Sequence, residues 1–257
     1  MRALTLITGA ASGLGRELAA QLARRGERLV LWDRDRERLE RTVTLLGPSV
    51  VHSDVVDVVN GDATREAAER SVDAAGPINR AIHCAAVMRV GPSLTMSATD
   101  YRATIETNYL GSVNVARALT PVLLDAGRRG GPSELVFIAS VAALRGVPSL
   151  AGYSASKHAV VGFAEALREE LSGEPIRVRV VCPPPAATST LLNMPELPPL
   201  FHIVRPQPVD KIAADVLRAL ERKHDLVLLD LRAKAVAWAQ RLVPSALAHV
   251  LKRAARR

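Results

Sequence analysis

The 257-residue sequence is short of aromatic side chains and cysteines, and it has no long apolar run. Aromatics make up 3% of the residues and no nucleic-acid-binding motif occurs, so we expect no nucleic-acid partner. Because no run of about 18 apolar residues occurs, we expect no membrane-spanning helix. The two cysteines, Cys84 and Cys182, lack metal-ligand spacing and the six histidines are scattered, so we expect no metal site.

The few cysteines also bear on location. Both lie in predicted core strands, and buried thiols are consistent with a reducing compartment. The first predicted strand begins at residue 3, which leaves no room for a signal peptide. We therefore expect a cytoplasmic protein.

Apolar residues, at 48% of the chain, gather in segments that alternate between strand and helix patterns. The predicted strands cover 3–8, 28–32, 55–59, 80–84, 135–139, 177–182 and 225–229. The predicted helices cover 14–25, 35–46, 64–74, 100–126, 154–172, 209–223 and 232–252. This order predicts a single α/β domain over residues 1–257, with a three-layer Rossmann-type, doubly wound parallel sheet of about seven strands and helices on both faces. A ligand is expected at the carboxyl ends of the strands.

Three glycines, Gly9, Gly13 and Gly15, stand between the first predicted strand and the helix that follows it. Glycines let the backbone approach a pyrophosphate closely, and a helix N-terminus supplies N–H donors and partial positive charge. The order strand, glycine loop, helix is the context in which such a loop binds a dinucleotide. The alternative is a tight turn without a ligand.

The second predicted strand leads into Asp33, about 20 residues after Gly13, which is the separation at which an acid meets the adenosine ribose. A carboxylate accepts hydrogen bonds from the ribose hydroxyls and repels a 2′-phosphate, so Asp33 favours NAD over NADP. Arg34 follows directly and could hold that phosphate. Its alternative role is that of a solvated partner in the charged run 34–38.

Tyr153 and Lys157 stand four residues apart in a predicted helix, so their side chains leave the same face. At roughly 4 Å and an effective dielectric constant of about 20, an ammonium group would stabilise a phenolate by about 4 kcal/mol. This pairing is expected to lower the pKa of Tyr153 toward neutrality, where a phenol can exchange a proton with a substrate hydroxyl. The alternative is an ordinary amphipathic helix with a surface lysine.

In combination these residues resemble the short-chain dehydrogenase/reductase family over about residues 3–190. The matches are the nucleotide-loop pattern Thr8-Gly9-x-x-x-Gly13-x-Gly15 and the four catalytic positions Asn108, Ser140, Tyr153 and Lys157, with Ser140 standing 13 residues before Tyr153. Each piece alone is common, whereas the combination is highly specific.

The resemblance implies an NAD(P)-dependent oxidoreductase that interconverts an alcohol and a ketone or aldehyde, and Asp33 favours NAD(H) over NADP(H) as its cofactor. It implies that Tyr153 is the general acid or base, that Ser140 holds the substrate oxygen, and that Lys157 lowers the tyrosine pKa and binds the nicotinamide ribose. Asn108 is expected to anchor a water that links Lys157 to solvent. The residues expected at the cofactor are Gly9, Ser12, Gly13, Leu14, Gly15, Asp33, Arg34, Asp62, Ala63, Ala85, Tyr153, Lys157, Pro183 and Thr188. The family also implies a homodimer or homotetramer, formed through helices 100–126 and 154–172.

Three places depart from the family pattern. His83-Cys84-Ala85-Ala86 stands where the family has Asn-Asn-Ala-Gly. A histidine could tie neighbouring strands together as the asparagine does, while the methyl group of Ala86 would press toward the cofactor. Pro183-Pro184-Pro185 replaces the family's Pro-Gly, so this loop is expected to be stiffer and differently paired. For the acid at the adenine, Asp62 is our choice and Asp54 the alternative.

The segment 189–208 is rich in leucine and proline and follows neither a strand nor a helix period. A loop this apolar is expected to fold over something apolar, and in the family this segment is the lid over the substrate. We therefore expect a small apolar alcohol or carbonyl compound as substrate. The alternatives are a dimer contact or a plug of the core.

The C-terminal part of the chain carries most of the positive charge. From Arg205 to Arg257 there are 12 basic and 5 acidic residues, which gives +7 of the net +8. Within the basic amphipathic extension 231–257, one helix face carries Leu231, Ala235, Trp238 and Leu242, flanked by Arg232, Lys234 and Arg241. Such a segment can lie peripherally on an anionic membrane surface, and the alternative is a terminal helix packed on the domain.

Two classes of function are compatible with these features. The first is the oxidoreductase, which the four catalytic positions favour. The alternative is a cofactor-binding regulatory or membrane-surface scaffold protein without turnover, which the changes at Ala86 and Pro184 leave open.

Overall fold

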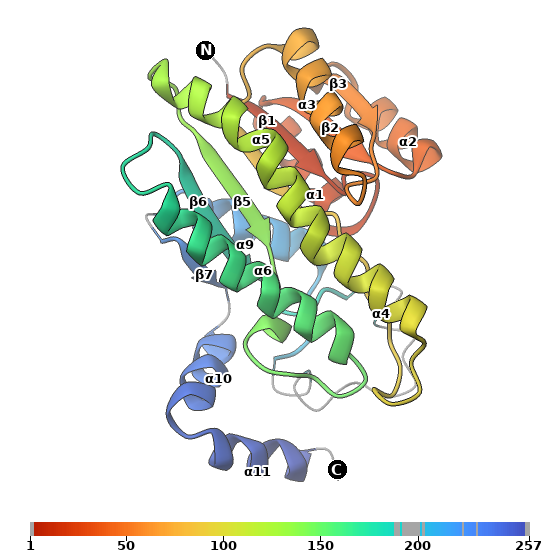
Figure 1. The fold of residues 1–257 in the computed structure, drawn as a ribbon, viewed down its shortest axis with the longest axis vertical. Helices are drawn as coiled ribbons and strands as arrows, with labels where there is room; N and C mark the ends of the chain where they lie inside the picture. The colour runs from red at the N-terminus through yellow and green to blue at the C-terminus, as the bar shows by residue number, and fades with distance from the viewer. Residues whose placement is uncertain are drawn as a thin grey trace.

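The computed structural model describes residues 3–187, 191, 201, 204–222, 224–229 and 231–254. Its centre is a seven-stranded sheet in the order β3-β2-β1-β4-β5-β6-β7, in which every neighbouring pair is parallel (Figure 1). The strands are β1 (Leu4–Thr8), β2 (Arg28–Asp33), β3 (Val50–Val55), β4 (Arg80–His83), β5 (Glu134–Ile138), β6 (Arg177–Cys182) and β7 (Leu226–Leu228). The central strands β1 and β5 are buried along their whole length, as expected where helices cover both faces of a parallel sheet.

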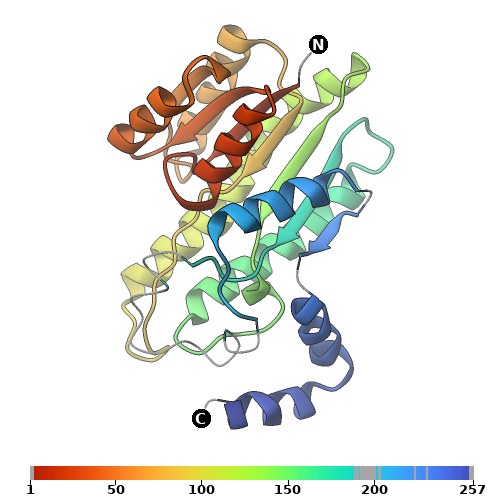
Figure 2. The same ribbon diagram turned by 180° about the vertical axis from the view of Figure 1, so that it is seen from behind.

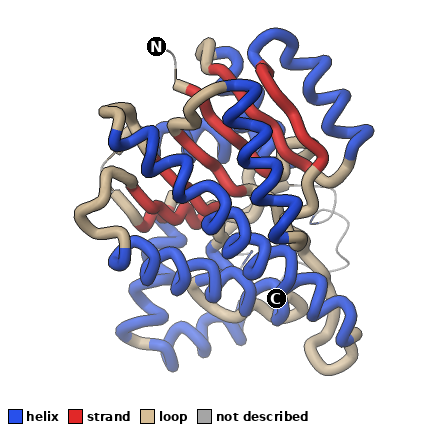
Figure 3. The backbone as a smooth tube through the Cα atoms, turned by 45° about the horizontal axis from the view of Figure 1, so that its top comes forward, coloured by secondary structure: helices blue, strands red, loops and turns tan. Residues whose placement is uncertain are grey.

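Two groups of helices sandwich this sheet. One face is covered by α3 (Gly61–Ala75), α5 (Gly111–Arg128) and α6 (Ala151–Glu170). The other is covered by α1 (Gly13–Arg24), α2 (Arg36–Leu46) and α9 (Val209–Leu220), which lie in front in the reverse view (Figure 2). Alternate residues of β1 serve the two layers, because Leu6 packs with α3 and α5 whereas Ile7 packs with α1 and α9. Figure 3 shows helices along both faces of the strands, which confirms the predicted Rossmann-type architecture.

Most predicted elements are present, and three differ. The third strand is β3, at Val50–Val55, whereas the sequence predicted 55–59. Pairing with β2 ends at Asp33 opposite Val55, so the valine-rich stretch that follows leaves the sheet. The predicted helix 100–126 is divided into α4 (Ala98–Ile105), a π-helical turn η2 (Glu106–Leu110) and α5.

The predicted helix 232–252 consists of two helices, α10 (Leu231–Leu242) and α11 (Pro244–Ala254). Pro244 begins the second helix, because its ring fits the first helical turn and is excluded from a helix interior. Among the helices that the structure describes, none is both long and apolar enough to span a bilayer.

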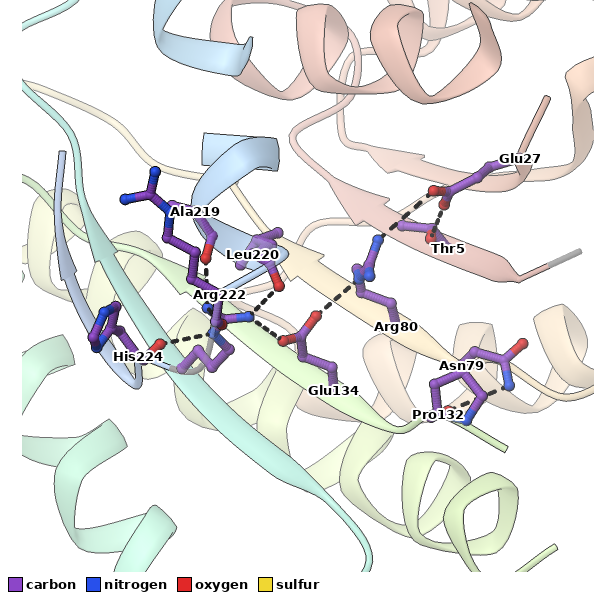
Figure 4. Close-up of polar contacts among 11 residues, drawn as sticks. Thr5, Glu27, Asn79, Arg80, Pro132, Glu134, Ala219, Leu220, Arg222 and His224 are labelled. Atoms are coloured by element: carbon purple, nitrogen blue, oxygen red, sulfur yellow. Dashed lines mark hydrogen bonds and ion pairs between the residues drawn. The ribbon is translucent and has the colours of Figure 1, made fainter. Parts of the chain in front are cut away.

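A buried charge network holds the amino ends of the strands together (Figure 4). Arg179 on β6 has no exposed surface, and its five N–H groups reach five acceptors. These are Glu134 on β5 at 2.7 Å and the carbonyl groups of Ala219, Leu220, Arg222 and His224 at 2.7–3.0 Å. Glu134 also accepts a hydrogen bond from Arg80 at 2.9 Å. The network therefore fixes the C-terminus of α9 at the amino ends of the strands.

Candidate active site

The glycine loop between β1 and α1 is packed so closely that two of its glycines have no room for a side chain. A Cβ atom on Gly9 would lie 2.7 Å from the Ala85 nitrogen, and one on Gly15 would lie 2.2 Å from the Gly9 carbonyl oxygen. Gly13 differs, because it has φ +52° and a Cβ there would meet nothing within 4 Å. Open space beside a left-handed glycine at a helix N-terminus is the arrangement that a pyrophosphate needs, so the loop fits a dinucleotide.

This loop forms one wall of a cavity of about 330 Å³ at the carboxyl ends of the strands. The other walls come from the ends of β2, β3 and β4. The cavity also reaches Ile138 at the end of β5. Of the residues predicted at the cofactor, those that line it are Gly9, Ser12, Gly13, Leu14, Gly15, Asp33, Arg34 and Ala85.

Asp33 is held in place by backbone groups on both sides. One carboxylate oxygen accepts a hydrogen bond from the Ala11 amide at 2.9 Å, and the other accepts one from the Asp35 amide at 3.0 Å. Arg34 is exposed at the cavity rim, and Arg38 beside it forms an ion pair with Asp35 at 3.3 Å. The cavity therefore has a fixed carboxylate at the β2 end with guanidinium groups at its edge.

The structure places both acids that the sequence offered near β3 outside the cavity. Asp62 lies in the first turn of α3 with 89% of its side chain exposed, and neither it nor Ala63 lines the cavity. The alternative, Asp54, also lies outside the cavity and forms an ion pair with Arg70 at 2.7 Å. The acid after β3 that does line the cavity is Asp57. The sequence did not single it out, because the third strand was predicted at 55–59 and ends at Val55. An end of the third strand at Val55 would have singled out Asp57 as the first acid after it.

Ser140, Tyr153 and Lys157 come together beside Ile138, at the carboxyl end of β5. Ser140 follows β5 and caps the short 3-10 helix η3 (Val141–Ala143), accepting a hydrogen bond from the Ala142 amide at 3.1 Å. Tyr153 and Lys157 project from the first turns of α6, and the Lys157 Nζ lies 5.7 Å from the centre of the Tyr153 ring. Lys157 is buried and donates a hydrogen bond to the Ile138 carbonyl at 2.9 Å. Because Ile138 lines the cavity, this contact joins the cluster to the cavity.

The charge states of this cluster differ from the expectation. Burial raises the pKa of Tyr153 to about 12, although a hydrogen bond with Ser140 acts in the opposite direction. Burial likewise lowers the pKa of Lys157 to about 8. The predicted lowering of the tyrosine pKa toward neutrality is therefore wrong for this structure. The physical reason is that the ammonium group bonds to Ile138 and faces the ring, while desolvation opposes charge on both groups.

Asn108 occupies the π-helical turn η2 with its side chain fully buried. Its side-chain oxygen accepts a hydrogen bond from the Val87 amide at 2.8 Å, and its nitrogen donates to the Val87 carbonyl and to the Ser156 hydroxyl, both at 2.9 Å. The Asn108 side chain thus links the loop after β4 to α6. Its contact on α6 is Ser156, the residue before Lys157. A water at Asn108 stays a prediction.

His83 ties β4 to β1, as the departure from the family pattern suggested. The Thr8 hydroxyl accepts hydrogen bonds from the Cys84 and Ala85 amides, each at 3.2 Å, and lies 2.7 Å from His83 Nδ1. The Thr8 hydroxyl thus links the carboxyl end of β1 to the His83 ring and to the two amides that follow it. Burial, followed by the charge of Lys157, lowers the pKa of His83 to about 3, so the ring is neutral.

The proline loop after β6 is hydrogen-bonded to two other segments of the chain. Pro183 accepts a hydrogen bond from the Val141 amide at 3.1 Å, and Pro185 and Ala187 exchange hydrogen bonds with Gln207 at 2.9 Å. Pro183 does not line the cavity, and Thr188 lies outside the described residues. Of the segment 189–208, the described residues Leu191, Phe201 and Val204 are buried.

Comparison with known proteins identifies the family. A family model described as short chain dehydrogenase matches residues 3–196. A 1-deoxy-11-beta-hydroxypentalenate dehydrogenase from Streptomyces avermitilis is 38% identical over 69% of this chain and 66% of its own length. The dehydrogenase/reductase SDR family member 7B from Xenopus laevis is 33% identical over 95% of this chain and 79% of its own length.

Two solved structures share the fold over nearly the whole chain. A short chain dehydrogenase from Burkholderia cenocepacia in complex with NADP has a TM-score of 0.83 and 30% identity, and covers 97% of both chains. A short chain dehydrogenase/reductase from Burkholderia phymatum in complex with NAD has a TM-score of 0.80 and 27% identity, and covers 93% of both. The chain therefore belongs to the short-chain dehydrogenase family and is an oxidoreductase that uses a nicotinamide cofactor to interconvert an alcohol and a carbonyl group.

Proposed function

We propose that the protein acts on an apolar alcohol or ketone, with Tyr153 as the general acid or base and NAD(H) as the preferred cofactor. The observation that carries this proposal is the meeting of Ser140, Tyr153 and Lys157 beside a cavity that fits a dinucleotide. When bound, the nicotinamide ring gives or takes the hydride. The protein must therefore hold the substrate oxygen and exchange a proton with it.

Tyr153 Oη is the proposed site of that proton exchange. The Ser140 hydroxyl hydrogen-bonds to the tyrosine and can also donate to the substrate oxygen, which stabilises negative charge there. Lys157 has a pKa near 8 and so carries its proton at neutral pH, which adds a buried positive charge near the reacting oxygen. Asn108 is proposed to position this lysine by fixing the neighbouring Ser156 on α6.

The proposed preference for NAD(H) rests on Asp33. Both of its oxygens are tied to backbone amides, so the carboxylate is held at the cavity wall where an adenosine ribose would lie. A 2′-phosphate there would face a fixed negative charge, whereas ribose hydroxyls would find an acceptor. Asp57 is proposed in place of Asp62 as the acid near the adenine, because only Asp57 lines the cavity.

The apolar character of the substrate is inferred from what surrounds Tyr153. The tyrosine packs against a cluster formed by Val141, Leu150, Leu191 and Phe201, among other apolar residues. A substrate that reaches the phenol would therefore meet apolar side chains from the loop after β5 and from the predicted lid. Polar substrates would lose their hydration there without replacement.

Self-association is proposed through the outer faces of α5 and α6. The two helices lie side by side on one face of the molecule, and a shallow groove between them is lined by Val113, Pro121, Phe163 and Leu167, among others. A dimer or tetramer built on this surface would be visible by light scattering. We further propose a cytoplasmic location.

The experiment combines cofactor titration with a screen of apolar ketones. We expect NADH to bind and at least one ketone to be reduced, and Tyr153→Phe to lower turnover by about 100-fold or more while cofactor affinity is kept. Tyr109→Phe is the matched control, since the Tyr109 ring packs on Phe163 and does not line the cavity. Equal turnover in wild type and Tyr153→Phe would refute the proton role. Tight cofactor binding without turnover on any substrate would favour the regulatory alternative, for which the comparisons give no support.

A further inference from the structure

Helix α10 places its small apolar residues inward and its large ones outward. Ala233 and Val236 are buried against the domain, whereas Leu231, Trp238 and Leu242 are 81%, 68% and 66% exposed. A helix that only packs on its own domain turns its larger apolar side chains inward. The reversed arrangement indicates that something outside the described chain covers these residues.

The exposed residues form one continuous face. Leu231, Ala235, Trp238 and Leu242 recur at the spacing of one side of a helix and define what we call the outer face of α10. All four are exposed, and Val243 extends the surface at 51% exposure. Lys234 and Arg241 lie along one margin of this face and are also exposed.

The rest of the molecule holds this face in a fixed position. Ala233 and Val236 of α10 and Leu247 of α11 pack into the cluster that contains Val141 and Phe201. Arg145 also donates a hydrogen bond to Gln240, on the inner side of α10. Figures 1 and 2 show α10 and α11 projecting from the sheet at the end where the carboxyl-end loops lie. The outer face is thus anchored from behind and turned away from the domain.

The charge of this region argues for one kind of partner. Residues 231–257 contain seven basic residues, Arg232, Lys234, Arg241, Lys252, Arg253, Arg256 and Arg257, and no acidic residue. Two copies of this chain meeting through the outer face would bring 14 like charges together, which opposes a symmetric dimer. An anionic surface complements the same charges.

We propose that the outer face of α10 docks on a bilayer that contains anionic phospholipid. Leu231 and Leu242 enter the acyl boundary, Trp238 lies at the headgroup level, and the basic residues attract the lipid phosphates. Since the cluster behind α10 also contains Tyr153, docking brings the apolar side of the active site close to the bilayer. This last consequence rests on the proposed function, and it makes the substrate an alcohol or ketone dissolved in the membrane.

The docking test needs no turnover, so it is independent of the proposed function. The chain has two tryptophans, and Trp32 is fully buried with its indole N–H bonded to Ser71 at 3.1 Å. A blue shift of tryptophan emission on adding vesicles therefore reports Trp238. We expect the shift, and co-sedimentation, with vesicles of phosphatidylcholine and phosphatidylglycerol. With phosphatidylcholine alone, or in high salt, binding should fall by about tenfold or more.

Variants then locate the contact. The double substitution Trp238→Gln with Leu242→Gln should reduce binding to anionic vesicles by at least about tenfold, and Lys234→Gln with Arg241→Gln should weaken it less. Leu45→Gln on α2, which removes a 72% exposed leucine far from α10, is the matched control and should bind as wild type. Unchanged thermal unfolding of each variant excludes misfolding. No vesicle binding by the wild type, or equal binding by the Trp238/Leu242 variant, would overturn the proposal. So would a dimer that the same variant dissociates.

Discussion

The carboxylate of Asp33 accepts a hydrogen bond from the Ala11 amide at 2.9 Å, so the end of β2 is tied directly to the glycine loop. The acid at the predicted ribose position is therefore bonded directly to the loop at the predicted phosphate position. The position of the Asp33 carboxylate is thus fixed, so a single substitution at Asp33 can test the proposed cofactor preference.

Asp33→Asn is expected to reduce the preference for NADH over NADPH by about tenfold, which corresponds to about 1.4 kcal/mol. The amide removes the negative charge and keeps one acceptor oxygen, which can still accept from the Ala11 amide, while the bond from the Asp35 amide is lost. The measurement is the ratio of the two dissociation constants from titration. Asp54→Asn is the control, because Asp54 pairs with Arg70 outside the cavity and its loss should leave the ratio unchanged. An unaltered ratio in Asp33→Asn would contradict the assignment.

Gly13→Ala should weaken cofactor binding by about tenfold or more, because its methyl group would project into the space kept open beside the loop. The positive φ of +52° adds a backbone cost of about 1 kcal/mol to folding. Gly130→Ala is matched to it, since Gly130 has φ +79° and equally open surroundings but lies in an exposed turn after α5. Both variants should lose similar stability and only Gly13→Ala should lose affinity, as calorimetry and urea unfolding would show. Equal affinities would mean that the loop does not hold the cofactor.

Lys157→Met is expected to stabilise the protein at neutral pH. Burial lowers the pKa of Lys157 from 10.5 to about 8, so below pH 8 the folded state carries a buried charge that the unfolded chain solvates freely. This buried charge lowers the free energy of unfolding of the wild type by about 3 kcal/mol. Methionine removes that penalty but also loses the hydrogen bond to Ile138, which is worth about 1 kcal/mol. A net gain of about 2 kcal/mol should therefore appear in urea unfolding at neutral pH.

The sign of the pH dependence follows from the same shift. Between pH 8 and pH 10.5 the unfolded chain holds the lysine proton more often than the folded protein does. The free energy of unfolding of the wild type therefore rises with pH relative to that of the variant. The difference between Lys157→Met and wild type should shrink across this window. Lys211→Met, which removes an exposed lysine on α9, is the control for the loss of a lysine from the surface. A difference that stays constant with pH would contradict the buried-charge explanation.

Arg179→Met should lower the free energy of unfolding by about 3 kcal/mol or more. The substitution leaves several buried carbonyl groups and one oxygen of Glu134 without a hydrogen-bond donor. Arg128→Met removes an exposed pair with Glu174 and should change stability by less than about 1 kcal/mol. Urea unfolding of both variants measures the contrast. Similar midpoints for the two would show that the buried network is energetically minor.

The sequence predicted the architecture well because strand and helix periods are local. It failed at β3, where Asp54 to Val59 has the composition of a strand but pairing with β2 stops at Val55. That limit is set by pairing with β2, which is distant in sequence, and the misplaced strand end led to the choice of Asp62, which does not line the cavity, over Asp57, which does. Likewise, the spacing of Tyr153 and Lys157 predicted their proximity but not their desolvation, which outweighs their mutual attraction.

A truncation that removes α10 and α11 would be a poor test of membrane binding. Val141 and Ala142, which follow Ser140, are buried in one cluster with Ala233, Val236 and Leu247. Deleting residues from 231 onward would expose the apolar cluster on which Tyr153 packs and would remove the proposed lipid-binding face in one step. Loss of activity in a shortened chain would thus say nothing about membranes, and only point changes on the exposed side can separate the two roles.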